Sequence, residues 1–361
     1  MKRIGNLYEK IISLDNLRRA ERKARRGKVS SYGVRVFDRD PEGNLLALHE
    51  ALLTKTFKTS PYEVFTVFEP KERLIYRLPY YPDRIVHHAV MNILEPIWVS
   101  VFPYNTYSCI KHRGIEAARK RVRKILSDPV NARYCLKIDI RKFYPSILHE
   151  IAKAIYRKKI KCPSTLWLLD EIVDSVNGAP DPLNPDGVCQ GRSIPIGNYI
   201  SQYLANLILS YLLHRINSEF PQVKGVVYAD DGSFFAADKA ILHVLEKFID
   251  AELNKLYLAL KGNYQIFPVA KNRYDKHGRG VDFLGYVFYL EQTCIRKSIK
   301  QNFCRRVASL YKRKTPLSPA DFKTAVCSWL GWVKYSDSEH LLKTIIKPPY
   351  YGILRPQALK N

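Results

Sequence analysis

Two adjacent carboxylates, Asp230 and Asp231, lie where the sequence predicts the tip of a β-hairpin. Residues 223–228 before them and 232–236 after them are rich in β-branched and aromatic side chains, which favour paired strands, and Gly232 would ease the turn. Neighbouring carboxylates repel each other unless cations neutralise them. A solvated Asp-Asp-Gly turn would fit this segment taken alone. The pair therefore predicts either an exposed turn or a divalent-metal site at the end of two strands.

A second acidic strand favours the metal site. Residues 134–140 read as a buried strand that carries Asp139 near its end. If this strand lies beside the hairpin, Asp139 can meet Asp230 across adjacent strands. Together they would form the carboxylate cage that two metal ions, about 3.5–4 Å apart, require. Between the acidic segments, residues 194–202 carry a glycine-bearing turn into a helix, where a base pair or a phosphate could approach the backbone.

The rest of the pattern alternates helices and strands. We expect basic helices in the first sixty residues, with Ser13 or Asp15 as a cap and an apolar stripe of Leu45, Leu48, Leu52 and Leu53. The further expected elements are a hairpin at 62–78 turning at 69–72, a helix opened by Asp83, a helix from Pro145-Ser146, a loop at 177–190, helices at 198–217 and 242–260, a strand at 283–288 and a basic helical end. This order predicts an α+β fold on an antiparallel sheet.

Charge restricts the partners. The 361 residues include 59 Lys+Arg against 34 Asp+Glu, a formal net charge of +25, which favours a polyanion such as nucleic acid. Basic residues cluster at 18–28, 119–124 and 292–320. No apolar run is long enough to span a membrane, and no signal peptide is visible. The seven cysteines contain no CxxC pair, which disfavours a zinc knuckle and is typical of reduced thiols in a cytoplasm.

These segments resemble reverse transcriptases, in the family's order and over nearly the whole chain. Residues 136–144 (LKIDIRKFY) look like the first catalytic motif, 228–231 (YADD) like the second, and 283–286 (FLGY) like the primer-grip region. The hairpin after Lys71 resembles the fingers of bacterial members. The resemblance implies a right-hand polymerase fold with fingers, an antiparallel-sheet palm and a helical thumb. We expect fingers at 1–130, a palm at 131–288 with finger-like insertions near 150–190, and a thumb at 289–361.

One departure from the family pattern narrows the resemblance. Most reverse transcriptases carry Gln-Gly and then Ser-Pro in the middle motif, whereas this chain has Ile196-Gly197 and then Ser201-Gln202, as in reverse transcriptases of diversity-generating retroelements. Residues 258–265 and 328–332 also look like that lineage. The resemblance implies copying of a template-repeat RNA into adenine-mutagenised cDNA in a bacterial or phage-infected cytoplasm. It further implies an RNA–cDNA duplex, dNTPs and a small basic helical accessory protein as partners.

The resemblance assigns roles to individual residues. Asp139 and Asp230, with the backbone carbonyl of Ile140, would bind two Mg²⁺ ions, with Mn²⁺ as an alternative, and Asp231 would assist them. The residues expected to contact the dNTP are Arg73, Arg77, Tyr144, Ile196, Gly197 and Gln202. Those expected to contact the nucleic acid are Arg305, Arg306, Gly285 and Tyr286. Lys261 is a weaker candidate for protonating the leaving group, and Lys71 for clamping phosphates.

Other functions stay open at this point. A viral-type RNA-dependent RNA polymerase shares the palm chemistry, but an aromatic ring at Tyr144 would clash with a ribose 2′-hydroxyl. A retron or group II intron reverse transcriptase is a closer alternative. However, the carboxy-terminal part has no Val-Thr-Gly triplet, and little sequence follows the expected thumb. A non-catalytic RNA-binding module would explain the charge but would leave the three aspartates without a role.

Overall fold

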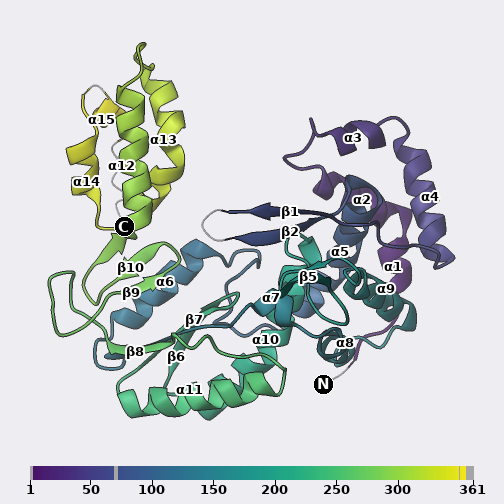
Figure 1. Cartoon of the computed structure of the whole chain (residues 1–361), viewed down its shortest axis with the longest axis horizontal. Helices are drawn as coiled ribbons and strands as arrows, with labels where there is room; N and C mark the ends of the chain where they lie inside the picture. Colours follow the sequence, from purple (N-terminus) through teal and green to yellow (C-terminus); the bar gives the residue numbers. More distant parts are fainter. Residues whose placement is uncertain (1–2, 69–71, 349, 355–361) are drawn as a thin grey trace.

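The computed structural model describes residues 3–68, 72–348 and 350–354. Figure 1 shows the helices of the amino-terminal part and those of the carboxy-terminal part as two arms on either side of a central sheet. A β-hairpin projects from the amino-terminal arm toward the gap between them. Within the described residues, no helix is both long and apolar enough to span a membrane.

The central sheet is antiparallel, with strand order β6-β7-β3-β8. Its strands are β3 (Tyr134–Asp139), β6 (Lys224–Tyr228), β7 (Asp231–Ala236) and β8 (Gln265–Pro268). Successive side chains point to opposite faces. Leu136 and Phe234 therefore face α11 (Lys239–Asn254), while Cys135 and Phe235 join a second core that includes α6 (Ile115–Leu126). α6 thus packs on this sheet rather than on the amino-terminal helices, although its residues fall inside the range expected for the fingers.

The amino-terminal arm is helical, as predicted. Its helices are α1 (Tyr8–Ile12), α2 (Leu14–Ala24), α3 (Tyr32–Phe37), α4 (Pro41–Leu53) and α5 (Ile85–Val99). Ser13 caps α2 by accepting the Asn16 N–H at 3.4 Å. The expected apolar stripe is right in three positions, since Leu45, Leu48 and Leu52 are buried, but Leu53 is exposed.

The hairpin consists of β1 (Glu63–Val67) and β2 (Arg73–Arg77), paired in register from Glu63 opposite Arg77 to Val67 opposite Arg73. The predicted turn at 69–72, with Lys71, lies almost wholly outside the described residues. A helix begins close to Asp83, after a kink at Tyr81, but Asp83 does not cap it. Asp83 lies in a short π-helical segment, η1 (Tyr80–Arg84), and its buried carboxylate accepts the Ser60 N–H at 3.0 Å instead of capping α5.

Between the acidic strands lie four helices: α7 (Phe143–Ser146), α8 (His149–Arg157), α9 (Pro163–Asp174) and α10 (Tyr199–Glu219). The predicted loop at 177–190 contains a small ladder of β4 (Pro180–Asp181) and β5 (Asn184–Val188). The helix predicted at 242–260 runs instead from Lys239 to Asn254, because the side chain of Asp238 caps it at the Ala240 N–H.

The strand predicted at 283–288 is two strands. β9 (Val281–Phe283) and β10 (Tyr286–Phe288) are separated by a turn in which Leu284 and Gly285 have φ of 50° and 82°. β11 (Thr293–Ile295) completes this three-stranded sheet. Beyond it, α12 (Lys297–Tyr311), α13 (Pro319–Lys334), α14 (Glu339–Ile345) and α15 (Tyr350–Leu354) enclose their own core, which includes Phe303, Val307, Phe322 and Val326.

Candidate active site

The adjacent carboxylates occupy a tight turn between β6 and β7. Tyr228 pairs with Asp231, so that Ala229 and Asp230 form a two-residue connection in which Ala229 has a φ of 54°. Gly232 does not form part of the turn, contrary to expectation. It lies in β7 opposite Ile138, where a Cβ atom would come within 2.9 Å of the Ile138 side chain. Glycine is therefore required there for close strand packing.

Strand β3 brings the third carboxylate to the same sheet edge. Asp139 is the cross-strand partner of Asp231, not of Asp230 as the sequence suggested. Asp230 reaches the site from the turn, where its carbonyl accepts the Ile140 N–H at 3.3 Å. The three aspartates thus gather at one end of β3, β6 and β7. A local sequence pattern could predict that they lie close together, but not which residues pair across the strands.

Two lysines compensate these carboxylates. The ammonium of Lys261 lies 3.1 Å from Asp139 Oδ2, and that of Lys137 lies 2.7 Å from Asp231 Oδ1. Burial raises the pKa of the Asp231 carboxyl above its ordinary value, even though Lys137 opposes the shift. Lys137 was not singled out from the sequence. Its position two residues before Asp139 on the same strand face was the available signal.

The carboxylates divide between two neighbouring cavities. Asp139 and Asp230 line one of about 470 Å³, together with Arg73, Ile140, Arg141, Lys142, Leu260, Lys261 and Gly262. Asp231 lines another of about 430 Å³, together with Lys137, Gln265, Phe267, Arg279, Gly280, Asp282 and Arg296. Asp231 thus borders a different cavity from the other two, although it pairs with Asp139 across the strands.

The first cavity has the donors that a hard cation prefers. Within the described residues, no three carboxylate, histidine or cysteine side chains already form a closed metal-binding group. Two carboxylates, those of Asp139 and Asp230, nevertheless border one open cavity beside Ile140. Mg²⁺ is commonly held by one or two carboxylates plus substrate phosphates and water, so an open set of oxygen donors suits it. The residues present therefore fit the expected Mg²⁺ ions.

The hairpin contributes one of its two expected arginines. Arg73 lines the cavity that contains Asp139 and Asp230. Arg77, four residues along the same strand, forms an ion pair with Glu63 and is not among the residues that line that cavity. A role for Arg77 in holding phosphates would require this ion pair to open.

The middle motif is attached to the hairpin through its backbone. The Ile196 carbonyl accepts the Tyr76 N–H at 3.1 Å, and Gly197 adopts a φ of 114° against the Tyr76 carbonyl. The Tyr144 carbonyl accepts the Ile194 N–H at 2.9 Å. Burial raises the pKa of the Tyr144 hydroxyl, and Asp230 is among the charges close enough to contribute. The motif thus lies between the hairpin and the aspartates.

Two other predicted contact residues, Gln202 and Tyr286, differ in their exposure. Gln202 is exposed near the start of α10, where its side-chain oxygen accepts the thiol of Cys109. Tyr286 is buried, with its ring centroid 5.0 Å from that of Trp332. The Tyr286 ring thus packs between the small sheet and α13, and its expected contact with nucleic acid stays a prediction.

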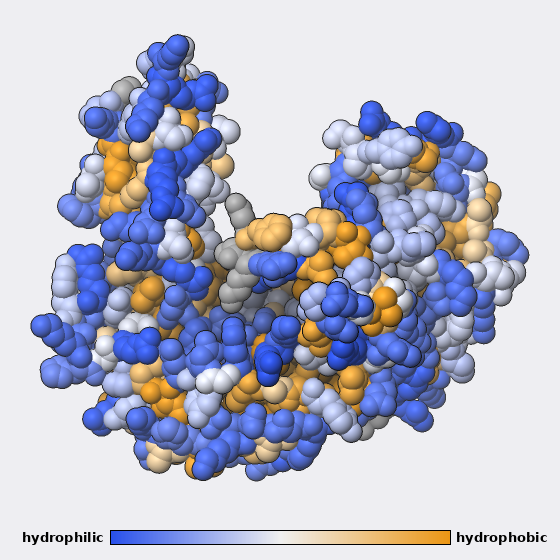
Figure 2. Space-filling view, in the orientation of Figure 1, coloured by the Kyte–Doolittle hydropathy of each residue, from blue (hydrophilic) through white to orange (hydrophobic). Residues whose placement is uncertain are grey.

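The remaining predicted nucleic-acid contacts lie at the base and on the surface of the carboxy-terminal arm. A Cβ atom at Gly285 would lie 2.5 Å from the Trp332 ring, so this glycine permits the arm to join the small sheet closely. Arg305 is exposed on α12, and the Arg306 side chain donates to the Ala325 carbonyl at 3.4 Å. Figure 2 shows a hollow between this arm and the amino-terminal arm, wide enough to be the most prominent feature of that face.

Comparison with solved structures defines the fold class. Apo telomerase from Candida tropicalis aligns with a TM-score of 0.50 at 13% identity, covering 79% of this chain and 54% of that one. An insertion-loop deletion mutant of the RNA-dependent RNA polymerase of a human picobirnavirus gives 0.50 at 12% identity, covering 82% and 59%. The chain has the right-hand polymerase fold, with fingers, an antiparallel-sheet palm and a helical thumb.

Sequence comparison gives the family. Residues 69–288, more than half of the chain, match the family described as reverse transcriptase (RNA-dependent DNA polymerase). The chain belongs to the reverse transcriptase family. Protein YkfC of Escherichia coli (strain K12) is 26% identical over 173 residues, which are 46% of this chain and 43% of that protein. The chain therefore spans less than half the length of this relative and just over half of the two polymerases.

Proposed function

We propose that this protein is an RNA-directed DNA polymerase that copies a template RNA into cDNA at the cavity bordered by Asp139 and Asp230. The observation that carries the proposal is the convergence of these two carboxylates, with Arg73, on one open cavity in a reverse transcriptase fold. We divide the chain into fingers at 1–130, palm at 131–288 and thumb at 289–361, except that α6 packs with the palm. We further propose a cytoplasmic location.

The side chains have distinct tasks in this proposal. Asp139 and Asp230, with the Ile140 carbonyl, would hold Mg²⁺, which when bound lowers the pKa of a primer 3′-hydroxyl and neutralises the departing pyrophosphate. Arg73 orients the triphosphate from the hairpin. Asp231, held by Lys137, adds negative charge from the adjoining cavity. Lys261 lies close enough to the site to supply a proton to the leaving group.

Asp230→Asn tests the assignment of the site. The substitution removes a charge without changing size, so RNA affinity and thermal stability should remain near those of the wild type. The rate of RNA-templated dNTP incorporation should fall on the order of a thousandfold, because the loss of metal binding removes several kcal/mol of transition-state stabilisation. The measurement is primer extension on an RNA template. Extension within about tenfold of wild type would refute the role of Asp230.

The finer proposal is that the enzyme belongs to a diversity-generating retroelement and works with a small basic accessory protein. Ile196 supports it, because an apolar side chain stands where most family members have a glutamine able to hydrogen-bond near the nascent base pair. Losing one such contact is worth roughly 0.5–1.5 kcal/mol, or about two- to tenfold in discrimination. Neighbouring genes encoding the accessory protein, beside two near-identical repeats that differ at adenines, would support this origin.

Ile196→Gln is expected to lower misincorporation opposite template adenine by about two- to tenfold. Sequencing of cDNA made by wild type and variant on one RNA template measures this, with processivity compared in parallel. An unchanged error frequency would mean that infidelity arises elsewhere in the pocket and that Ile196 only packs the turn.

A further inference from the structure

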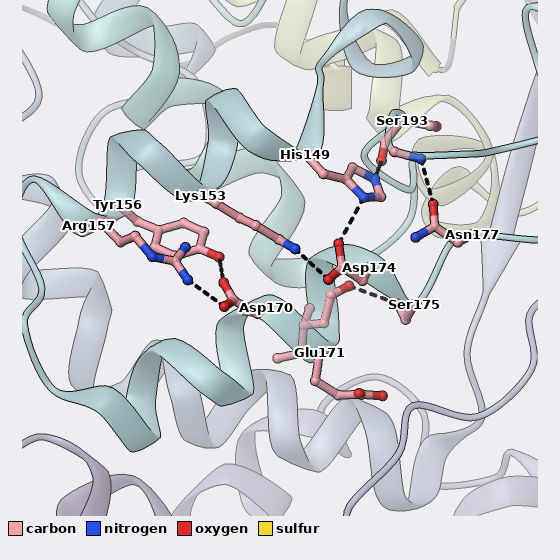
Figure 3. Close-up of polar contacts among 12 residues, drawn as sticks. His149, Lys153, Tyr156, Arg157, Asp170, Glu171, Asp174, Ser175, Asn177 and Ser193 are labelled. Carbon is pink, nitrogen blue, oxygen red and sulfur yellow. Dashed lines mark hydrogen bonds and ion pairs between the residues drawn. The ribbon is translucent and has the colours of Figure 1, made fainter.

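The segment 191–198 is held by a polar network that lies outside the catalytic cavity. In Figure 3, His149 of α8 stands between Asp174 of α9 and the backbone of Ser193. One ring nitrogen lies 3.1 Å from Asp174 Oδ1 and the other 3.0 Å from the Ser193 carbonyl oxygen. The ammonium of Lys153 lies 2.5 Å from the second oxygen of Asp174. The ring and its partners are thus fixed on both sides.

Two more side chains contact the same segment: Asn177, just beyond the end of α9, and Tyr62, which is itself in contact with Ser175. Asn177 Oδ1 accepts the Gly191 N–H at 2.9 Å. The Tyr62 hydroxyl lies 2.8 Å from Ser175 Oγ and accepts from Asn198 Nδ2 at 3.1 Å. Tyr62 directly precedes β1, so this last contact also joins the segment to the base of the hairpin. Both ends and the middle of 191–198 are therefore tied to α8, α9 or the hairpin.

This bracing explains how an unfavourable backbone persists. Ser193 is buried and has a φ of 83°, in the left-handed region that side chains other than glycine seldom adopt. Gly191 and Gly197 have φ of 64° and 114°. Glycine adopts a positive φ at little cost, but the conformation of Ser193 costs free energy, persists only where the surroundings over-determine it, and is of a kind that concentrates at functional sites. The backbone conformation of the segment that carries Ile196 is therefore stabilised by its surroundings.

The three residues Ser193, His149 and Asp174 are the residue types of a hydrolytic triad, but the geometry excludes that function. His149 contacts the main-chain carbonyl of Ser193, and a carbonyl oxygen has no proton to give up. Both oxygen atoms that face the ring are acceptors, so every hydrogen bond here is donated by the ring, which has one N–H when neutral and two when protonated. The network therefore positions the 191–198 segment and does not catalyse a covalent step.

We propose that His149 and Asn177 are positioning residues for nucleotide selection, acting by fixing the 191–198 segment so that Ile196 and Gly197 present one surface to the incoming nucleotide. The proposal rests on the proposed polymerase function. It follows from the path of contacts: His149, which is held by Asp174 of α9, contacts the Ser193 carbonyl, and Asn177 accepts the Gly191 N–H. The Ile196 carbonyl then accepts from Tyr76 in the hairpin strand that also carries Arg73. A loosened segment would bind the nucleotide less well while leaving the carboxylates in place.

Steady-state extension on an RNA template separates this role from a structural one. His149→Ala and Asn177→Ala should each raise KM for the correct dNTP about two- to tenfold, the effect of losing one or two hydrogen bonds, with an unchanged Kd for primer-template. Asn177→Asp keeps the acceptor oxygen and should restore KM. Asn177 is exposed, so its variants should fold even where His149→Ala does not.

Tyr156→Phe is the matched control. It removes the hydrogen bond from Tyr156 to Asp170, which joins α8 to α9 at the far end of the same interface, without reaching 191–198. We expect a lower Tm and an unchanged KM. If the two alanine variants behave like this control, with only Tm reduced, His149 and Asn177 are structural and the proposal fails.

Hydrogen–deuterium exchange gives a readout that needs no catalysis. Amides of 191–198 should exchange faster in Asn177→Ala than in the wild type, while those of the central sheet stay unchanged. If exchange is faster in Asn177→Ala but the wild-type protein cannot extend a primer, the bracing stands and the proposed function is refuted. Unchanged exchange would overturn the bracing whatever the activity.

Discussion

Tyr144 shows how a single residue is placed by the elements around it. It follows Lys142, whose φ of 43° turns the chain at the start of α7, and its neighbour Phe143 is buried with the two ring centroids 5.4 Å apart. The backbone of Tyr144 is bound by Ile194. The ring therefore packs beside Phe143, and its hydroxyl is close enough to Asp230 for that charge to contribute to its raised pKa.

Tyr144→Val should relax the choice of sugar. If the ring crowds the 2′ position of the incoming nucleotide, a smaller side chain admits ribonucleotides by removing a steric clash. The ratio of rNTP to dNTP incorporation on an RNA template should rise about tenfold or more, equivalent to about 1.4 kcal/mol of discrimination. Phe143→Leu, a change in the buried neighbour, serves as a control for general loosening. An unchanged ratio would show that Tyr144 does not select the sugar.

At the scale of elements, the hairpin places Arg73 and Arg77 in different surroundings, although the sequence predicted the same role for both. The alternation along residues 73–77 predicted that Arg73 and Arg77 share one face, and the strand confirms that both are exposed. Which of them reaches the site depends on the direction of the hairpin and on Glu63 in the opposite strand. Neither is encoded in the local pattern of β2.

Arg73→Gln is expected to raise KM for dNTPs, because it removes a charge-assisted contact worth roughly 1.5–3 kcal/mol, or at least about tenfold. Arg77→Gln should change KM little, since Arg77 is already paired with Glu63 outside the cavity lining. Steady-state kinetics of the two variants, made in parallel, measure the difference. Equal effects would mean that Arg77 leaves its ion pair when the nucleotide binds.

Helices and strands that follow from the periodicity of apolar residues were predicted well. The turn that depends on a positive φ at a residue other than glycine was not. The strand that carries Asp139 and the long helix α10 follow directly from their apolar patterns. The division of 283–288 into two strands depends on Leu284, a residue with no preference for a positive φ, held there by the packing of Gly285 on Trp332. Tertiary contact decides that turn, so local sequence could not.

Across the whole molecule, the carboxylates of the site were predictable and their counterions were not. Asp230 and Asp231 could be predicted because adjacent carboxylates repel each other, and Asp139 because it is an acid near the end of an otherwise apolar strand. Lys137 and the α8–α9 network around His149 are separated from their partners by 94 and 44 residues, and ordinary helix and strand patterns surround them. Their pairing emerges only when the sheet and helices are assembled.

Chelation should leave the fold nearly unchanged. Lys261 and Lys137 already oppose the charges of Asp139 and Asp231, so the native state does not depend on divalent cations to relieve repulsion. The Tm of the whole chain in EDTA should lie within about 2 °C of its value in Mg²⁺. Lys137→Met removes one counterion, and its Tm should become dependent on Mg²⁺. A large loss of Tm for the wild type in EDTA would contradict this assignment.

The lysine counterions also bear on whether the protein folds before or after it binds a metal ion. A site whose acids could meet only around a bound ion would leave each newly made chain waiting for that ion before it finished folding. Here Asp139 and Asp231 are each paired with a lysine of the same chain, so these two carboxylates can come together when the sheet forms. In the proposed polymerase, the loss of a metal ion between rounds would then leave the fold of the site in place.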